Sequence, residues 1–147
     1  SSNYGNQAMH SPINIKCLCG LVTLQLTHLP ERFSVCHCSS CQTWNGGPTM
    51  MAPCGENVVV LGKEHVKEFR SSEWARRAFC KECGSHMYSR FVNTGTFNIP
   101  AGHFASFAQM TMETQYFIDR KPGYYSFEDE SETLTSEEVF ALFTQSS

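Results

Sequence analysis

Alternation of apolar and polar residues is the dominant pattern along the chain. Val22, Leu24 and Leu26 alternate with Thr23 and Gln25, and this period of two predicts a half-buried strand. Other short segments have the composition of strands, and glycine or proline turns separate several of them. These predicted strands cover residues 33–36, 49–52, 58–61, 66–70, 75–79, 87–91, 96–99 and 115–118. The pattern therefore predicts a mainly β protein.

Two segments have the pattern of helices instead. A short helix is predicted over residues 39–44, and a longer one over residues 136–143 near the C-terminus. Thr135 and Glu138 have the spacing of a capping box at the start of the second helix. The apolar residues of this helix fall on one face: Val139, Phe140 and Phe143.

Length and composition indicate one globular domain. The 147 residues are 41% hydrophobic and 17% charged, which is typical of a folded chain with its own core. No apolar run approaches the 18 or so residues of a membrane span, and the first residues lack the pattern of a secretory signal. We therefore expect a cytoplasmic protein with no membrane partner.

The charge is unevenly distributed. Residues 128–147 contain six acidic residues and no basic one, whereas residues 1–127 carry a balance of +3. Seven basic residues lie between Lys63 and Arg90. Their density is too low for a nucleic-acid-binding face, so no nucleic-acid partner is expected. They are either an ordinary solvated surface or a mild attraction for a small anion.

Eight cysteines are the most informative residues, and seven of them form clusters. The clusters are Cys17-Leu18-Cys19, Cys36-His37-Cys38-Ser39-Ser40-Cys41 and Cys80-Lys81-Glu82-Cys83, while Cys54 stands alone. Pairs spaced C-x-C and C-x-x-C are typical of metal ligands rather than of a disulfide framework. Zinc is the metal expected, because it accepts four thiolates in a tetrahedron and is redox-inert.

Seven clustered thiols divide into four plus three. The favoured partition groups Cys17 and Cys19 with Cys80 and Cys83 as a closed, structural zinc site. It leaves Cys36, Cys38 and Cys41 for a second zinc with one open position, which is typical of a catalytic zinc. Other arrangements remain open at this point. Cys54 could close the second site, Cys38 and Cys41 could pair with Cys80 and Cys83 in a zinc ribbon, or no metal could bind.

Three thiolates and one Zn²⁺ carry a net charge of −1, which makes a weak Lewis acid. Such a site suits an exchangeable soft ligand better than it suits the acidification of water. It would keep a thiol deprotonated near neutral pH, where a free thiol with a pKa of about 8.5 is mostly protonated. Thiol chemistry is therefore a better hypothesis than hydrolysis.

The order of these motifs resembles the glutathione-dependent formaldehyde-activating enzyme family, whose domain centromere protein V shares. The matching stretches are Cys17-Leu18-Cys19-Gly20, residues 36–41, Gly46-Gly47-Pro48, residues 71–75, residues 79–86 and residues 117–125. The resemblance covers roughly residues 12–127. With it we divide the chain into a flexible segment (1–11), a zinc-binding formaldehyde-activating-type domain (12–127) and an acidic C-terminal segment with a helix (128–147).

The resemblance implies a β-tent of short antiparallel strands stapled by zinc, with two zinc ions per chain. It assigns Cys17, Cys19, Cys80 and Cys83 to the structural zinc. It assigns Cys36, Cys38 and Cys41 to the catalytic zinc. The implied activity is that of a carbon–sulfur lyase, in which formaldehyde joins glutathione as S-hydroxymethylglutathione, a step of aldehyde detoxification. The expected partners are thus a small thiol and a small aldehyde.

Several residues near the motifs are candidates for further roles. Gln42-Thr43-Trp44 stands where many family members carry a basic residue, so an anionic tripeptide would need a cation from elsewhere. The candidates for that cation are Arg70, Arg76, Arg77 and Arg90. Trp44 could wall a pocket, and His86 and Glu73 are acid–base candidates, although a structural or surface role is the commoner one for each type. His37 is not expected to be a ligand, and Cys54 is expected to be a buried apolar residue.

Three other functions compete with this one. The domain could be a non-catalytic zinc module that binds or carries a small thiol or a protein. A methionine sulfoxide reductase would need a redox cysteine on a late strand, but no cysteine follows Cys83. A chromosome-binding role by analogy with centromere protein V would call for a basic extension, whereas this chain ends in an acidic segment.

Overall fold

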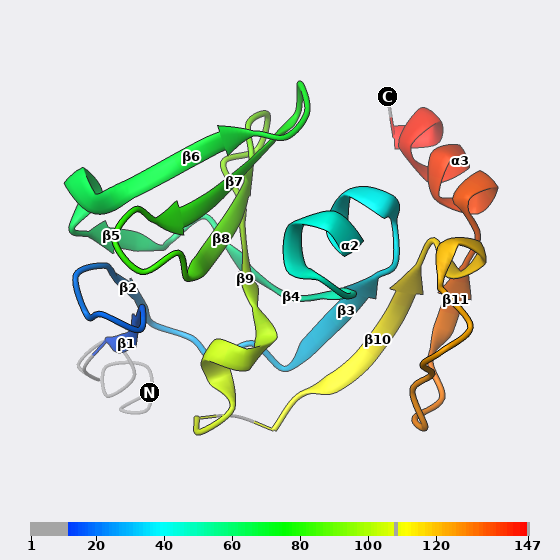
Figure 1. The fold of residues 1–147 in the computed structure, drawn as a ribbon, viewed down its shortest axis with the longest axis horizontal. Helices are drawn as coiled ribbons and strands as arrows, with labels where there is room; N and C mark the ends of the chain where they lie inside the picture. The colour runs from blue at the N-terminus through cyan, green and yellow to red at the C-terminus, as the bar shows by residue number, and fades with distance from the viewer. Residues whose placement is uncertain (1–11, 108, 147) are drawn as a thin grey trace, which may run out of the picture. The chain divides into compact units, whose positions relative to one another are not determined.

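The computed structural model describes residues 12–107 and 109–146. The predicted flexible segment 1–11 lies outside these residues. The chain forms two compact units, the first from Ser1–Pro30 with Pro53–Ala108 and the second from Glu31–Ala52 with Gln109–Ser147. The mainly β fold with a short C-terminal helix, expected from the sequence, is confirmed: eleven strands lie within the described residues. Figure 1 follows the strands along the chain.

A three-stranded antiparallel sheet begins the first unit. Its order is β1 (Ile13–Lys16), β2 (Thr23–Leu26) and β5 (Val59–Leu61). The alternation read from the sequence places its side chains correctly, because Val22, Leu24 and Leu26 are all buried. This sheet provides one wall of the core of the first unit.

Four further strands complete the first unit. They run antiparallel in the order β6 (Val66–Arg70), β7 (Ala75–Cys80), β8 (His86–Phe91) and β9 (Phe97–Pro100). The short 3₁₀ helices η1 (Lys63–His65) and η2 (Ala101–Phe104) adjoin them. Ala78, Met87, Ile99 and Phe104 are fully buried and form the centre of this core.

The second unit contains strands that pair in both directions. β3 (Arg32–Cys36) pairs antiparallel with β4 (Thr49–Gly55) and parallel with β10 (Thr111–Tyr116), which also pairs parallel with β11 (Glu132–Leu134). The expectation of antiparallel strands throughout is therefore wrong for β10. Parallel neighbours need a long connection, and the chain passes through the rest of the first unit between β3 and β10.

The second unit also contains the helices α2 (Ser39–Asn45) and α3 (Ser136–Ser146), and the 3₁₀ helix η3 (Ile118–Arg120). The predicted capping box of α3 is present, since the Thr135 N–H donates to Glu138 Oε1 at 2.9 Å and the Glu138 N–H donates to Thr135 Oγ1 at 3.2 Å. Of the three apolar residues on its predicted face, only Val139 is buried. Phe140 and Phe143 are more than half exposed. No helix in the described part of the chain is long and apolar enough to cross a membrane.

The strand predicted over residues 115–118 is displaced. β10 begins at Thr111 and ends at Tyr116, because Phe117 has a φ of 58° and turns the chain into η3. A left-handed residue cannot continue a strand. The strands β1 and β11 were not predicted, since four and three residues are too few to establish a period.

Gly62 is the glycine with the strictest steric requirement. Its φ is +80°, and a β-carbon there would lie 2.1 Å from the carbonyl oxygen of Leu21. Gly95 has a similar φ of +71°, but a β-carbon there would meet no atom within 4 Å. We expect Gly95→Ala to cost about 1 kcal/mol through backbone strain. We expect Gly62→Ala to cost about 3 kcal/mol or more through the added clash. Urea unfolding of the two variants at equal metal content measures the difference, and equal losses would contradict this account.

Candidate metal centres

Four cysteines of the first unit meet at one point. Cys17 and Cys19 lie in the turn between β1 and β2. Cys80 is the last residue of β7, and Cys83 lies in the turn between β7 and β8. Their four sulfur atoms all lie within 4.8 Å of one another. Cys19 Sγ is 3.5 Å from Cys17 Sγ and 3.7 Å from Cys80 Sγ. A tetrahedral zinc with Zn–S bonds of about 2.3 Å would separate its sulfurs by about 3.8 Å, so these thiols fit such an ion.

Two turns of similar construction hold these thiols. The Gly20 N–H donates to the Cys17 carbonyl at 3.0 Å, and the Gly84 N–H donates to the Cys80 carbonyl at 2.8 Å. Both glycines adopt a left-handed φ, 83° and 77°. This conformation is open to glycine at little cost and lets the backbone curl around the sulfurs. The glycine that follows each cysteine pair in the sequence is thus explained.

Ser85 connects the two turns and was not singled out from the sequence. Its Oγ accepts a hydrogen bond from the Leu18 N–H at 3.1 Å and lies 3.2 Å from Cys83 Sγ. Hydrogen bonds from the Ser85 hydroxyl and N–H lower the pKa of Cys83 to about 5, which favours the thiolate. The only signal available in the sequence was its position directly after Cys83-Gly84.

The other three clustered cysteines meet in the second unit. Cys36 is the last residue of β3, Cys38 is the N-cap of α2, and Cys41 lies in the first turn of that helix. Their sulfurs also lie within 4.8 Å of one another, and the Cys41 N–H donates to Cys38 Sγ at 3.4 Å. The structure therefore groups the seven thiols as four plus three. Cys54 belongs to neither group, and Cys80 and Cys83 lie with Cys17 and Cys19 rather than in a ribbon with Cys38 and Cys41.

Crowding of the three thiols makes full ionisation costly unless a cation is present. Hydrogen bonds with the Cys38 and Cys41 sulfurs, together with burial, raise the pKa of Cys36 far above its ordinary value. A soft divalent ion removes this cost, because it offsets the charge of the thiolates that it binds. Both groups therefore could hold metal ions, the first with four protein ligands and the second with three.

His37 lies between two of these cysteines, and its side chain is fully buried away from them. Its Nδ1 lies 2.8 Å from the Tyr125 hydroxyl, and its Nε2 lies 2.8 Å from Gln115 Oε1. Gln115 Nε2 in turn donates to Ser131 Oγ at 3.0 Å. The expectation that His37 is not a metal ligand agrees with these contacts, which use both of its ring nitrogens.

The donor and the acceptor of each hydrogen bond around His37 can be assigned. Gln115 Oε1 can only accept, so His37 Nε2–H is the donor and Nδ1 accepts from the Tyr125 hydroxyl. The Tyr125 oxygen then accepts from Gln42 Nε2 at 2.8 Å. Gln42 belongs to α2, which carries Cys41. Segments within and after the three-cysteine group are thus tied together through one buried imidazole.

The remaining candidates from the sequence lie outside both thiol groups. Glu73 is exposed, and His86 is partly buried on β8, where its carbonyl accepts from His103 Nε2 at 2.8 Å. Trp44 is half-buried on α2. Cys54 was expected to be buried, but it is only partly buried. This burial still raises the pKa of its thiol to about 11, so the thiol is protonated near neutral pH.

A mainly β fold with a four-thiol group and a three-thiol group defines a protein that could hold two metal ions. The sequence matches the glutathione-dependent formaldehyde-activating enzyme family over residues 12–120. The chain belongs to this family. An uncharacterized lyase of Schizosaccharomyces pombe is 33% identical over 124 residues, which cover 84% of this chain and 90% of that protein. Family membership and this relative support a lyase-type function.

A solved structure gives a comparison of the fold alone. A crystal structure of a Rhodobacter sphaeroides protein matches 68% of this chain and 99% of its own, with a TM-score of 0.55. The sequence identity is 16%. The likeness therefore bears on the arrangement of strands and not on the chemistry.

The contacts of His37 predict that Tyr125 stabilises the three-cysteine group. Tyr125→Phe removes the hydroxyl that donates to His37 Nδ1 and accepts from Gln42. We expect a loss of about 1–2 kcal/mol in the free energy of unfolding. We also expect about tenfold faster release of the more labile metal ion, because groups that orient ligands typically change metal affinity by 10- to 100-fold. Stopped-flow capture by a chromogenic chelator measures the release.

Tyr124→Phe is the matched control for this variant. Tyr124 is the neighbouring residue, its side chain is exposed, and its hydroxyl has no hydrogen bond within the described residues. It should release metal at the wild-type rate. Equal rates for Tyr125→Phe and Tyr124→Phe would show that the buried network does not hold the site.

Proposed function

We propose that the protein is a zinc-dependent carbon–sulfur lyase. In the synthetic direction it joins a formaldehyde-class aldehyde to a glutathione-class thiol, and in the reverse direction it releases them. The observation that carries this proposal is the three-cysteine group, which has one thiol fewer than a closed tetrahedral site needs. Membership in the formaldehyde-activating family supports the choice of substrates.

The two thiol groups have different roles in this proposal. Cys17, Cys19, Cys80 and Cys83 form a closed structural zinc site that joins two turns of the first unit. A site of this kind can contribute on the order of 10–16 kcal/mol to folding. Cys36, Cys38 and Cys41 form the open site where the substrate thiol binds. Zinc suits both groups because soft thiolate donors favour it and it does not cycle between redox states.

The reaction itself requires one bond to form and one proton to move. The thiol sulfur bonds to the aldehyde carbon while the carbonyl π electrons move to oxygen, and the oxygen gains the proton that the thiol loses. The product is therefore the S-hydroxymethyl adduct, with no oxidant or reductant consumed. A zinc ion on the three cysteines would supply an exchangeable position that keeps a thiol ionised near neutral pH. The chain contributes the geometry, since Cys36 is fixed by β3 and both Cys38 and Cys41 by α2.

The buried imidazole has a positioning role in this scheme. His37 N–H donates to the Tyr116 carbonyl at 3.0 Å, and its ring is held by Tyr125 and Gln115. These bonds fix the backbone between Cys36 and Cys38, which limits how far the α-carbons of the two cysteines can move apart. A reducing compartment such as the cytoplasm is part of the proposal, because free thiols and thiol substrates persist there.

Zinc stoichiometry tests the metal part of the proposal. We expect two zinc ions per chain in the wild type and one in Cys38→Ser, because a three-ligand site tolerates no loss. Cys54→Ser is the matched control, since Cys54 lies in neither group, and it should retain two. Elemental analysis of the purified variants gives the counts. Two zinc ions in Cys38→Ser would remove the basis for an open site.

Exchange kinetics test the activity. With ¹³C-formaldehyde and glutathione, NMR exchange spectroscopy measures how fast free and adduct carbon interconvert. We expect the wild type and Cys54→Ser to accelerate this exchange above the spontaneous rate and Cys38→Ser to leave it unchanged. If zinc becomes labile to millimolar glutathione while the exchange rate stays spontaneous, the protein is a thiol-binding zinc module rather than a lyase.

A further inference from the structure

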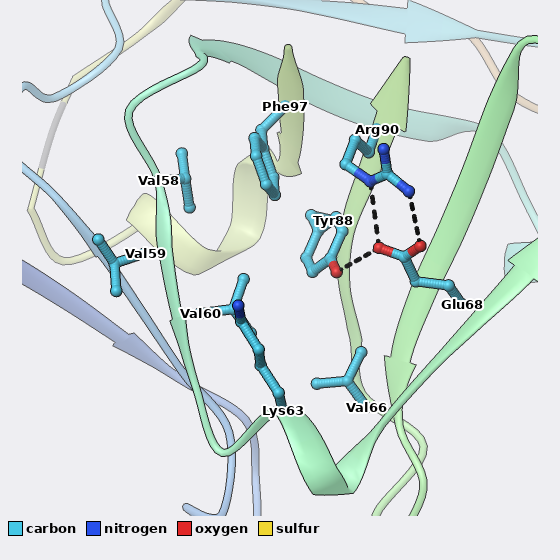
Figure 2. A pocket seen from close by; sticks show the side chains of 9 residues that line it. All are labelled: Val58, Val59, Val60, Lys63, Val66, Glu68, Tyr88, Arg90 and Phe97. Carbon is cyan, nitrogen blue, oxygen red and sulfur yellow. Dashed lines mark hydrogen bonds and ion pairs between the residues drawn. The ribbon is translucent and has the colours of Figure 1, made fainter. Parts of the chain in front are cut away.

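A pocket unrelated to the thiol groups lies in the first unit. Its volume is about 580 Å³, within the range of about 300–1,000 Å³ that small-molecule sites occupy. Figure 2 shows β5 and the residue before it along one side and the strands β6, β8 and β9 along the other. The lining residues are Val58, Val59, Val60, Lys63, Val66, Glu68, Tyr88, Arg90 and Phe97.

Most of this lining is apolar. The four valines form a wall of small branched side chains, and the rings of Tyr88 and Phe97 pack against each other with centroids 4.9 Å apart. Phe97 and Tyr88 are buried, whereas Val59 is 54% exposed. The pocket therefore runs from an exposed rim to an aromatic base, and an apolar body would lose contact with water there.

At the polar end of the pocket, hydrogen bonds join Glu68 to Tyr88 and Arg90. Glu68 accepts from the Tyr88 hydroxyl at 2.6 Å and from Arg90 through Nε at 3.2 Å and Nη2 at 2.8 Å (Figure 2). These hydrogen bonds, above all those from Arg90, lower the pKa of Glu68 and keep it ionised. Glu68 and Arg90 thus cancel each other's charge within the pocket.

Lys63 carries the one charge of the lining that the Glu68–Arg90 pair does not cancel. It lies at the start of η1 and its side chain is exposed. Its carbonyl accepts from the Val66 N–H, but its ammonium makes no ion pair or hydrogen bond within the described residues. In Figure 2 its side chain extends beside Val60. The lining as a whole therefore has one net positive charge.

Two more arginines stand in register beside Arg90. Arg76 lies directly opposite Arg90 between β7 and β8, and Arg70 lies directly opposite Arg76 between β6 and β7. Directly opposite residues of antiparallel strands share one face, where like charges destabilise the sheet. Glu68 is the acidic residue on this face of β6 and lies two residues from Arg70. The register thus places Arg70 and Arg76 in a row with Arg90 on one face of the sheet, beyond the lining of the pocket, although the chain as a whole carries a net charge of −3.

We propose that this pocket binds a small amphipathic carboxylate, with its apolar body between the valines and the aromatic base and its carboxylate at Lys63. The apolar wall and the single uncompensated positive charge both favour a ligand of this class, and the arginine row that includes Arg90 adds a longer-range attraction for an anion. The site uses residues of the first unit only and includes no cysteine, so its test is independent of the proposed lyase activity.

Three probes separate the contributions of body and charge. Octanoate has both, octan-1-ol has the body without the charge, and acetate has the charge without the body. In ¹H–¹⁵N NMR titrations of the zinc-loaded protein, we expect octanoate to shift the amides of residues 58–66 and 97 saturably. Octan-1-ol should bind about fivefold more weakly, as expected for one charge contact at an exposed rim. Acetate should not saturate at the same concentrations.

Two variants with matched charge changes test the role of Lys63. Lys63→Gln should weaken octanoate binding about fivefold and leave octan-1-ol binding unchanged. Lys67→Gln is the control, because Lys67 alternates with Val66 and Glu68 and so lies on the opposite face of β6. It should bind both probes as the wild type does.

A third variant tests the contact with the apolar body of the ligand. Its NMR spectrum also shows whether the protein is still folded. Val60→Trp should fill the pocket and weaken both octanoate and octan-1-ol, while the amides of the four-cysteine turns keep their wild-type positions. The proposal is overturned if octanoate and octan-1-ol bind the wild type equally. It is also overturned if Lys63→Gln and Lys67→Gln behave alike, or if the shifts lie outside the pocket residues.

Discussion

The meeting of thiol sulfurs is the constraint on which the rest of the structure depends. Sulfurs from turns 61 residues apart lie within 4 Å of each other, as Cys19 and Cys80 do. Ionised thiolates in such a cluster repel one another. A bound cation offsets their charge and links the two turns through its bonds to sulfur. The β1–β2 turn and the β7–β8 turn therefore have to present their cysteines to one point. The left-handed glycines Gly20 and Gly84 are the local means by which both turns do so.

Local patterns predicted a large part of this arrangement. Spacing along the chain predicted the alternation around Leu24 and the α2 and α3 segments. It favoured the four-plus-three grouping of cysteines but left other groupings open. Contacts between distant residues could not be predicted in this way. His37 and Tyr125 are 88 residues apart, and no period or spacing connects them. The same holds for Ser85, whose partner Leu18 is 67 residues away.

Register is the second kind of information that spacing does not contain. The sequence shows seven basic residues between Lys63 and Arg90, but it does not show that Arg70, Arg76 and Arg90 stand opposite one another. The position of strand ends is equally hidden, since β10 stops at Tyr116 only because Phe117 takes a left-handed conformation. Periodicity marked an apolar face on α3, yet burial depends on what covers that face, and only Val139 is covered.

The parallel pairing of β10 with β3 has a consequence for biosynthesis. A chain emerges from the ribosome in sequence order, so Cys36, Cys38 and Cys41 leave the exit tunnel long before Gln115 and Tyr125 do. For that interval the nascent chain has its three thiols but lacks the strand and the buried network that hold them in place. Metal binding and oxidation therefore compete for these thiols from the time of translation onward. The four-cysteine group, in contrast, has all of its thiols and both of its turns once residues up to Ser85 have emerged.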